Sequence, residues 1–322
     1  AVADGVYTLD RFETSKDNDG AVTITQEALT SGNAYTNGFK TALKVDVTTA
    51  DGTLASNQRL FIQQIIEAQN LQLLKFGTAN AEKLTLSFWV KATKTGTNIV
   101  RMYAYDDDRS CSQSYTVSTT NTWEHKVLNF PADTTGVIDN DNGQGIQIAW
   151  GIGAGASFQS GTLQTTWGSN SAANDFVGQV NNLDSTSNNF HITGVQLEVG
   201  EFSSTTLPPF QHESFGDNLS RCQRYFQLIS KMSGGTSNST TAYVNPSFFS
   251  TLRAAASFSV EGALSMQDSE SNVTQSSGQV TLHNGNETGA FLELNNFSGL
   301  TDNRPFLTRY LNNNKLKVDA EL

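Results

Sequence analysis

Three consecutive carboxylates, Asp106 to Asp108, follow a strand-like stretch that reads YAYDDDRS. Enzymes that cleave polysaccharides use two carboxyl groups held about 5–10 Å apart, one as acid and the other as base or nucleophile. These aspartates are therefore the best candidates in the chain for hydrolysis of a glycan. A solvated turn in which Arg109 partners the carboxylates explains the same residues without any chemistry.

Two further groups of residues have the chemistry of a sugar-binding site. An aromatic ring stacks on the apolar face of a pyranose, while neighbouring amides and carboxylates bond its hydroxyl groups. One ring is Trp167 in the loop TTWGSNSAAND, where its polar neighbours are Asn170, Asn174 and Asp175. The strand VRMYAYDDD places Tyr103 and Tyr105 on one face, with acids beyond them. Packing inside the fold is the commoner role of such rings, so both roles stay open.

Two Asp/Asn/Gly segments have the composition of calcium loops. DNDNGQG carries Asp139 and Asp141 at alternate positions before a glycine turn, and KDNDG, residues 16–20, is a shorter version. Calcium takes six to eight oxygen ligands, and neither segment has the final glutamate of an EF-hand loop. Such runs also form ordinary turns. We expect no required cofactor and leave a structural calcium ion open.

Other catalytic patterns are missing from the sequence. The four histidines are scattered, and none forms an HxH or HxxxH pair that would indicate a metal site. There is no GxSxG motif and no glycine-rich phosphate loop. We therefore predict that the protein is not an enzyme and assign no catalytic residue.

The composition limits the partners and the fold. A formal net charge of −11 disfavours nucleic acids and anionic membranes, because both require a basic surface. No apolar run approaches the roughly 20 residues of a membrane span. The two cysteines lie far apart in the sequence, so we expect free and mostly buried thiols rather than a disulfide. Only 16% of residues are charged, and Gly, Asn, Ser and Thr supply many turn signals.

Short alternating segments predict an all-β fold. About ten such segments precede residue 200, and they are separated by turn clusters without helical periodicity. They predict a jelly-roll β-sandwich over residues 1–207, in which one or two helical turns cover residues 67–77. The segment FHITGVQLEVG, residues 190–200, reads as the closing strand. Pro208 and Pro209 end the sheet, because proline cannot donate to a β-ladder.

A linker with a short helix, residues 208–226, follows the sandwich. Phe215, Leu219, Cys222 and Phe226 are spaced by four, three and four residues, which predicts an amphipathic helix. Arg221 and Arg224 share one face, where they bind carboxylates of the fold or an anionic sugar. Residues 227–322 predict a smaller β domain of about six strands, of the kind that gains stability by oligomerising. Its loops TSNSTTAYVN and HNGNETG suit contacts with a partner.

Four sequence blocks carry a resemblance to a known class of proteins. They are GVYTLDRF, LTLSFWVKATKTGT, ITGVQLEVG with the following PF, and NLSRCQRYF, and the chain ends in VDAEL. In this order they resemble the fibre and receptor-binding proteins of tailed bacteriophages, whose sandwich module is similar to carbohydrate-binding jelly rolls. The resemblance covers nearly all of residues 1–226 and is weaker over 227–322.

The resemblance implies a structural virion protein that attaches the phage to glycans or a receptor on the host surface. It also implies a homotrimer that contacts other virion proteins, and a first strand and attachment segment upstream of residue 1. Two alternatives stay open. The protein could decorate the head or tail and stabilise the particle, or it could be a polysaccharide depolymerase that uses the Asp106 to Asp108 region.

Overall fold

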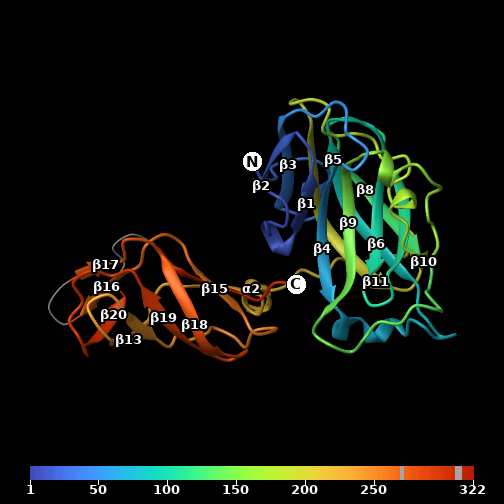
Figure 1. Cartoon of the computed structure of the whole chain (residues 1–322). Coiled ribbons are helices and arrows are strands. Elements are labelled where there is room, and N and C mark those ends of the chain that lie inside the picture. The colour runs from blue at the N-terminus through green and yellow to red at the C-terminus, as the bar shows by residue number, and fades with distance from the viewer. Residues whose placement is uncertain (269–271, 309–313) are drawn as a thin grey trace. The chain divides into compact units, whose positions relative to one another are not determined.

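The computed structural model describes residues 1–268, 272–308 and 314–322. The chain forms two compact units, Ala1–Gln211 and His212–Leu322, called unit 1 and unit 2 below (Figure 1). The division falls after the two prolines that were predicted to end the first sheet. The predicted linker helix begins after this division, so it belongs to unit 2.

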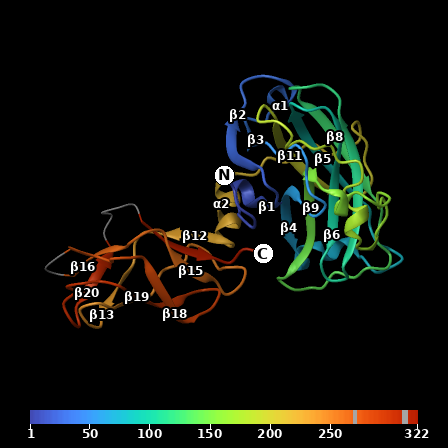
Figure 2. The same cartoon turned by 45° about the horizontal axis from the view of Figure 1, so that its top comes forward.

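Unit 1 consists of two antiparallel sheets, and the predicted all-β sandwich is confirmed (Figures 1 and 2). The six-stranded sheet has the order β1 (Glu13–Asp17), β4 (Arg59–Glu67), β9 (Gln144–Ala154), β6 (Gly96–Ala104), β7 (Arg109–Val117) and β10 (Gly168–Ser169). The five-stranded sheet has the order β2 (Ala21–Ala28), β3 (Thr41–Thr49), β11 (Asn189–Val199), β5 (Leu84–Ala92) and β8 (Glu124–Phe130).

The alternating sequence pattern explains the core between these sheets. In β5, Leu84, Leu86 and Phe88 point inward and are almost fully buried. The Phe88 ring meets Trp150 of β9 edge-on, with 5.8 Å between the ring centroids. Each such buried side chain contributes about 1.5–3 kcal/mol of hydrophobic free energy. The two inner faces therefore hold the sheets together, and their outer faces are left for other contacts.

Strand β11 is last in the sandwich sequence but central in its sheet. It pairs with β3 on one side and β5 on the other, whereas a closing strand suggests an edge position. The pairing with β5 shifts register between Thr193 and Gln196, around Gly194. Gly194 has φ +59°, and a Cβ there would lie 2.5 Å from the Phe39 ring. Glycine is required at this bulge because any side chain would meet that ring.

Helices in unit 1 are short. They are η1 (Leu9–Arg11), α1 (Asn33–Thr36), η2 (Ala68–Leu74), η3 (Ala156–Phe158) and η4 (Ala172–Asn174). The predicted turns at residues 67–77 correspond to the 3₁₀-helix η2, which buries Leu71 and Leu74. Among the described residues, no helix is long and apolar enough to cross a membrane. Cys111 and Cys222 form no disulfide with each other, as predicted, and Cys111 is buried whereas Cys222 is partly exposed.

Unit 2 begins with α2 (Phe215–Gln223), whose N-terminus is capped by Ser214. The backbone N–H of Asp217 donates to Ser214 Oγ at 3.2 Å, so one unpaired helix donor is satisfied. The apolar stripe predicted on this helix is exposed, since 83% of Phe215 and 42% of Leu219 are accessible. Arg221 pairs with Glu213 at 2.8 Å, which is a carboxylate contact within the same unit.

Two antiparallel sheets form the rest of unit 2. The three-stranded sheet has the order β12 (Phe226–Ile229), β21 (Leu316–Asp319) and β15 (Ser257–Val260). The seven-stranded sheet has the order β17 (Asn272–Thr274), β16 (Ser265–Asp268), β20 (Pro305–Thr308), β13 (Ser233–Thr236), β14 (Ala242–Val244), β19 (Ala290–Asn295) and β18 (Gln279–Gly285). The end of the predicted strand PFLTRYL lies outside the described residues.

Two strands occupy segments that contain few apolar residues. They are β13 and β17, and β13 lies in the middle of the seven-stranded sheet, between β20 and β14. Its sequence SGGT has no hydrophobic alternation, so periodicity cannot find it. A Cβ on Gly234 would lie 1.9 Å from the carbonyl oxygen of Tyr243. Close backbone packing therefore explains why a glycine-rich segment forms a central strand here.

Candidate functional site

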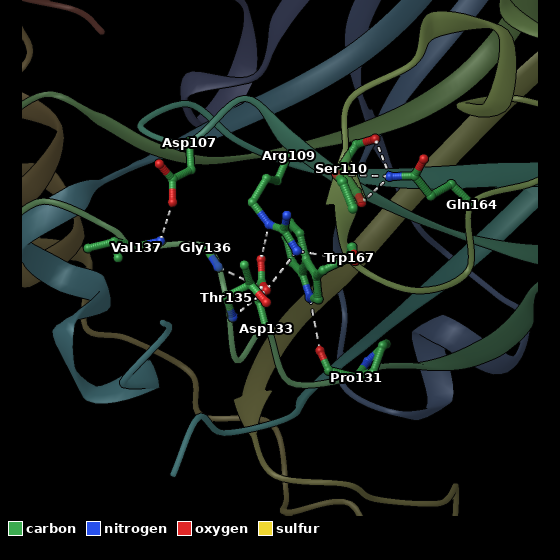
Figure 3. Close-up of polar contacts among 11 residues, drawn as sticks. Asp107, Arg109, Ser110, Pro131, Asp133, Thr135, Gly136, Val137, Gln164 and Trp167 are labelled. Carbon is green, nitrogen blue, oxygen red and sulfur yellow. Dashed lines mark hydrogen bonds and ion pairs between the residues drawn. The ribbon is translucent and has the colours of Figure 1, made fainter. Parts of the chain in front are cut away.

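Trp167, predicted to bind sugar, is part of the core of unit 1. The residue is 8% exposed, and its indole N–H donates to the Pro131 carbonyl oxygen at 2.9 Å (Figure 3). Its ring meets Phe76 edge-on at 5.4 Å between centroids. A ring that is covered in this way cannot stack on a sugar without opening the fold. Of the two roles left open for Trp167, the structure therefore supports packing.

A buried ion pair lies beside Trp167. Arg109 donates from Nε and one terminal nitrogen to the two carboxylate oxygens of Asp133, at 2.6 and 3.0 Å (Figure 3). Asp133 Oδ1, which accepts the bond from the terminal nitrogen of Arg109, also accepts the backbone N–H groups of Thr135 and Gly136. Arg109 was predicted to partner the neighbouring acids, but its partner is Asp133, 24 residues further along the chain. This pair joins the start of β7 to the loop after β8.

Two polar neighbours of Trp167 form hydrogen bonds within the fold. Asp175 is 1% exposed, and it accepts hydrogen bonds from Arg101 at 2.7 Å and from Ser110 at 3.0 Å. Asn174 accepts the backbone N–H of Thr162. Asn170 is half-buried. Asp175 is therefore a buried anchor of the fold, and a sugar-binding role for the rest of this loop stays a prediction.

Tyr103 and Tyr105 lie on the outer face of the six-stranded sheet, where the structure does gather polar groups. Cross-strand registry aligns Tyr103 with Gln147 of β9 and with Ser110 of β7. The adjacent row aligns Arg101 with Ala149 of β9. That row continues across Gln63 of β4 to Glu13 of β1. These five strands, at about 4.8 Å spacing, extend over about 19 Å. We call the side chains of Glu13, Gln63, Arg101, Tyr103, Tyr105 and Gln147 the tyrosine surface.

The segment from residue 155 to 182 packs on the outer face of the six-stranded sheet beside the tyrosine surface. Phe176 stacks on Phe61 of β4 at 4.0 Å between centroids, and Phe158 meets the same ring edge-on. Ile99, Ala149 and Ala154 complete this small second core. The ion pair of Arg101 with Asp175 lies where the covering segment meets the tyrosine surface. A long loop thus leaves only part of the sheet free for a ligand.

Hydrogen bonds fix the geometry of the tyrosine surface. The Tyr103 hydroxyl donates to Asp108 at 2.9 Å, and the Gln147 amide donates to the Tyr105 hydroxyl at 2.9 Å. Arg101 also donates to Gln147. The two tyrosine rings meet edge-on at 4.8 Å between centroids. Side chains held in this way lose little conformational freedom on binding, which favours recognition of a ligand.

Both tyrosines stay protonated near neutral pH. Burial, followed by the hydrogen bond to Asp108, raises the pKa of Tyr103 to about 12. Burial also raises the pKa of Tyr105 above its usual value. The Tyr105 hydroxyl can therefore donate to a ligand, whereas the Tyr103 hydroxyl, whose proton is donated to Asp108, can accept from one. The half-buried rings offer apolar area beside them. This combination of ring, hydroxyl, amide and carboxylate suits a polyhydroxylated ligand.

The three aspartates proposed for hydrolysis bind the backbone and a tyrosine. Asp106 accepts the N–H of Asp139 at 2.9 Å, and Asp107 accepts the N–H of Val137 at 2.6 Å. Asp108 accepts the Tyr103 hydroxyl. Burial raises the pKa of Asp106, and the charges of Asp139, Asp141 and Asp107 add to this rise. These contacts tie two loops together, and the predicted absence of enzymatic activity stays a prediction.

The calcium prediction also stays open. Asp141 accepts the backbone N–H of Gly143 at 2.8 Å, which is ordinary turn geometry. Asp139 donates its backbone N–H to Asp106, so the two acidic loops are neighbours. Within residues 1–268, 272–308 and 314–322, no group of three or more His, Cys, Asp or Glu side chains is arranged to hold a metal ion.

A groove of about 680 Å³ lies along one edge of the sandwich, away from every predicted site residue. It is lined by parts of β7 and β8 and by residues 201–206. Its charged side chains are paired, Lys126 with Glu124 at 2.6 Å and Glu201 with Lys83 at 2.5 Å. Lys126 lies on the edge strand β8, and such a charge discourages pairing with a further strand.

The fold and the site define an antiparallel β-sandwich with a polar, aromatic surface on one sheet. The sequence matches no protein-family profile, and no curated protein is significantly similar to it. Part of the fold is similar to the enzymatically active domain of tailspike protein 4 of bacteriophage CBA120, at 14% identity and a TM-score of 0.34. That alignment covers 62% of this chain and 21% of the tailspike chain, so the protein spans about a fifth of that length.

Two smaller proteins align with the same share of this chain. A structure described as CBM4 has 12% identity and a TM-score of 0.33, and the alignment covers 62% of this chain and 92% of the other. A protein of Bacteroides thetaiotaomicron described as sugar-binding has 13% identity and a TM-score of 0.30, over 62% and 94% of the two chains. Similarity at this level does not extend to function.

The sequence predicted two of the six residues of the tyrosine surface. Glu13, Gln63 and Gln147 were missed because they come from three other strands that are far apart in the chain. Arg101 was missed although it lies on β6, two residues before Tyr103. One signal was present, since polar residues interrupt otherwise apolar strands in RLFIQQII and IQIAWGIG. A glutamine within a buried strand indicates a hydrogen-bonding role on one face.

Proposed function

We propose that this protein is a fibre protein of a bacteriophage virion, that it attaches the particle to glycans on the host surface, and that the tyrosine surface makes the sugar contacts. The observation that carries the proposal is the pair Tyr103 and Tyr105, partly exposed on the outer face of a sheet and held by hydrogen bonds beside amide and carboxylate groups. The four sequence blocks that resemble phage fibre proteins support the virion setting.

The chemistry of the surface favours an uncharged glycan. The guanidinium of Arg101 is neutralised by Asp175, so it has little attraction left for an anionic sugar. Glu13 accepts the amide of Gln63 at 2.9 Å and adds negative charge at the β1 end of the surface. A sugar hydroxyl can donate to such a carboxylate, whereas a uronate or sialate would be repelled.

We place the protein on the outside of the virion as a homotrimer that contacts other virion proteins. A single shallow sugar site binds weakly, but three copies on one particle raise the effective affinity through multivalency. No cofactor is needed for this function, although calcium at the Asp139 and Asp141 loop would be compatible with it. Sedimentation of the purified chain tests the assembly: a trimer is expected, and a stable monomer contradicts it.

Glycan binding by the full chain tests the proposal. Immobilised neutral and acidic oligosaccharides are presented to the protein, and we expect binding to neutral members that Tyr103→Ala and Tyr105→Ala weaken at least about tenfold. Tyr35→Ala, which removes another tyrosine of unit 1, is the matched control. Retained melting temperatures show that the variants are folded. Equal binding by wild type and both site variants would refute the role of this surface.

The same samples separate the alternatives. A depolymerase would release oligosaccharides from a bound polysaccharide, and Asp107→Asn would abolish the release. A decoration protein would bind no glycan and would repeat over the capsid with its local symmetry. Imaging of the particle with a specific antibody therefore distinguishes a projecting fibre from a shell protein.

A further inference from the structure

A second hollow lies in unit 2, on the outer face of the seven-stranded sheet. It is a groove of about 700 Å³, within the range of about 300–1,000 Å³ that is usual for ligand sites. Its lining residues are Ser233, Gly234, Asn245, Gln267, Pro305, Phe306 and Leu307. Strand β13 supplies Ser233 and Gly234, and the neighbouring strands supply the walls.

The groove carries no charged side chain among these residues. Its polar groups are the amides of Asn245 and Gln267 and the hydroxyl of Ser233, and its apolar groups include Leu307, which is 64% exposed. Amides both donate and accept hydrogen bonds, so they match hydroxyl groups of either orientation. An uncharged lining leaves no counter-ion for a phosphate, a sulfate or a carboxylate. The chemistry therefore fits a neutral polyol beside an apolar surface.

An aromatic cluster continues the same face on the next strands. Ala242 and Val244 of β14 point into the core, so Tyr243 between them points away from it. The Tyr243 ring stacks with Phe291 of β19 at 5.3 Å between centroids and meets His283 of β18 edge-on at 5.7 Å. Phe291 is 38% exposed, so the cluster offers accessible ring area.

A carboxylate is held against this cluster. Glu293 lies opposite Tyr243 in the strand pairing, and its Oε2 lies 2.5 Å from Nε2 of His283. Hydrogen bonding from His283 holds the pKa of Glu293 below its usual value. The side chains of Asn295 and Tyr243 also donate hydrogen bonds to this carboxylate, and its remaining lone pairs can accept a hydroxyl group of a ligand that covers the rings. Ring area next to a fixed acceptor is the arrangement that binds a pyranose.

We propose that this face of unit 2 is a second glycan-binding site, in which the groove and the aromatic cluster bind successive residues of one neutral oligosaccharide. The class of ligand rests on the proposed function, but the site is separate from the tyrosine surface. From Gln267 on β16 to His283 on β18 there are five strand spacings, or about 24 Å. That length accommodates several sugar residues.

A peptide or a second copy of the chain fits this face less well. Strand β13 is paired on both sides, by β20 and β14, so the floor of the groove has no free edge for an added strand. The exposed apolar side chains are also separated. Leu307 and Phe291 lie on strands β20 and β19, with β13, β14 and the polar Asn245 between them. A large, continuous apolar patch is what a protein interface requires.

Calorimetric titration of the full chain with cellotetraose, maltotetraose and chitotetraose tests this site, with tetragalacturonate as the acidic comparison. We expect at least one neutral tetrasaccharide to bind, and Tyr243→Ala and Asn245→Ala each to weaken the binding at least about tenfold. Phe249→Ala removes another exposed aromatic ring of unit 2, which is 60% exposed and outside the groove, and should change nothing. Circular dichroism verifies that each variant is folded.

The outcomes separate this site from the tyrosine surface. Binding that is lost in Tyr103→Ala but kept in Tyr243→Ala and Asn245→Ala overturns the second site and leaves the proposed function standing. Binding of none of the three neutral tetrasaccharides, or equal preference for tetragalacturonate, also overturns the second site. A change of oligomeric mass in Tyr243→Ala with unchanged sugar binding would identify this face as an interface between copies instead.

Discussion

Asp133→Asn is the substitution for which the structure predicts the largest effect from the smallest change. The carboxylate accepts four hydrogen bonds, two from Arg109 and two from backbone N–H groups, and its side chain is 2% exposed. The side-chain oxygen of an asparagine can replace Asp133 Oδ1 and keep its three hydrogen bonds, from Arg109, Thr135 and Gly136. The NH₂ group of the asparagine then faces the Arg109 Nε–H. One bond becomes a donor–donor contact, and the guanidinium keeps its charge without a counter-ion.

The expected loss of stability follows from this geometry. Removal of one partner of a buried ion pair costs about 3–5 kcal/mol, because the other charge stays buried. The Arg109 side chain is 14% exposed, so water reaches part of it and we expect the lower end, about 3 kcal/mol. For a unit of this size that corresponds to a decrease of about 6–12 °C in the melting temperature of unit 1.

Urea unfolding followed by tryptophan fluorescence measures this loss, since all four tryptophans lie in unit 1. Asp107→Asn is the matched control, because Asp107 is exposed and its carboxylate accepts the backbone N–H of Val137 (Figure 3). We expect that control to lose less than about 1 kcal/mol. Equal unfolding midpoints for the two variants would refute the assignment of Arg109 and Asp133 as a structural ion pair.

Acid unfolding gives a second test of the same pair. Burial alone would raise the pKa of Asp133, but hydrogen bonds from Arg109, Gly136 and Thr135 outweigh it and hold the pKa below its usual value. The stabilisation is therefore present above the unfolded-state pKa, about 3.9, and is lost as the pH falls through the lower folded-state pKa. Asp133→Asn does not titrate, so its stability should fall less steeply over this range. An identical acid profile for both proteins would contradict the pKa shift.

Two further predictions concern thiol reactivity and the β11 bulge. Burial raises the pKa of Cys111 to about 12, so alkylation of the native protein at pH 8 should modify only Cys222, as mass spectrometry of the peptides would show; rapid modification of both thiols would contradict this. Gly194→Ala should destabilise unit 1 by about 1–3 kcal/mol, because a Cβ would meet the Phe39 ring, whereas Gly52→Ala has open space and should not. Similar melting temperatures for these two variants would refute the role of the bulge.

Strand periodicity made the sandwich predictable, because burial of one face imposes a two-residue repeat that single segments display. The alternation of Leu84, Leu86 and Phe88 is visible without any knowledge of the partner strand. The burial of Trp167 was not predictable in this way. It depends on how residues 155–182 cross the sheet, and that path is set by contacts with Phe61 and Arg101, far away in the sequence.

The unit 2 face shows the same limit. The segments around Tyr243 and His283 were recognisable as polar and turn-rich, but their proximity depends on the strand order β14, β19, β18. That order brings Phe291 between two segments that are about 40 residues apart in the chain. Local sequence patterns predict strands, whereas sites formed across several strands follow from long-range pairing.

The covering segment of residues 155–182 has a consequence for how such a protein can change. Its contacts with Phe61 and Arg101 set the border between the closed and open halves of one sheet face. Trp167 is the residue of this segment that belongs to the main core, so substitutions elsewhere in the segment can move the border while that core is kept. Loops tolerate such changes better than strands do. A single stretch of chain could thus widen or narrow the area offered to a glycan, and alter the range of surfaces recognised, on an unchanged scaffold.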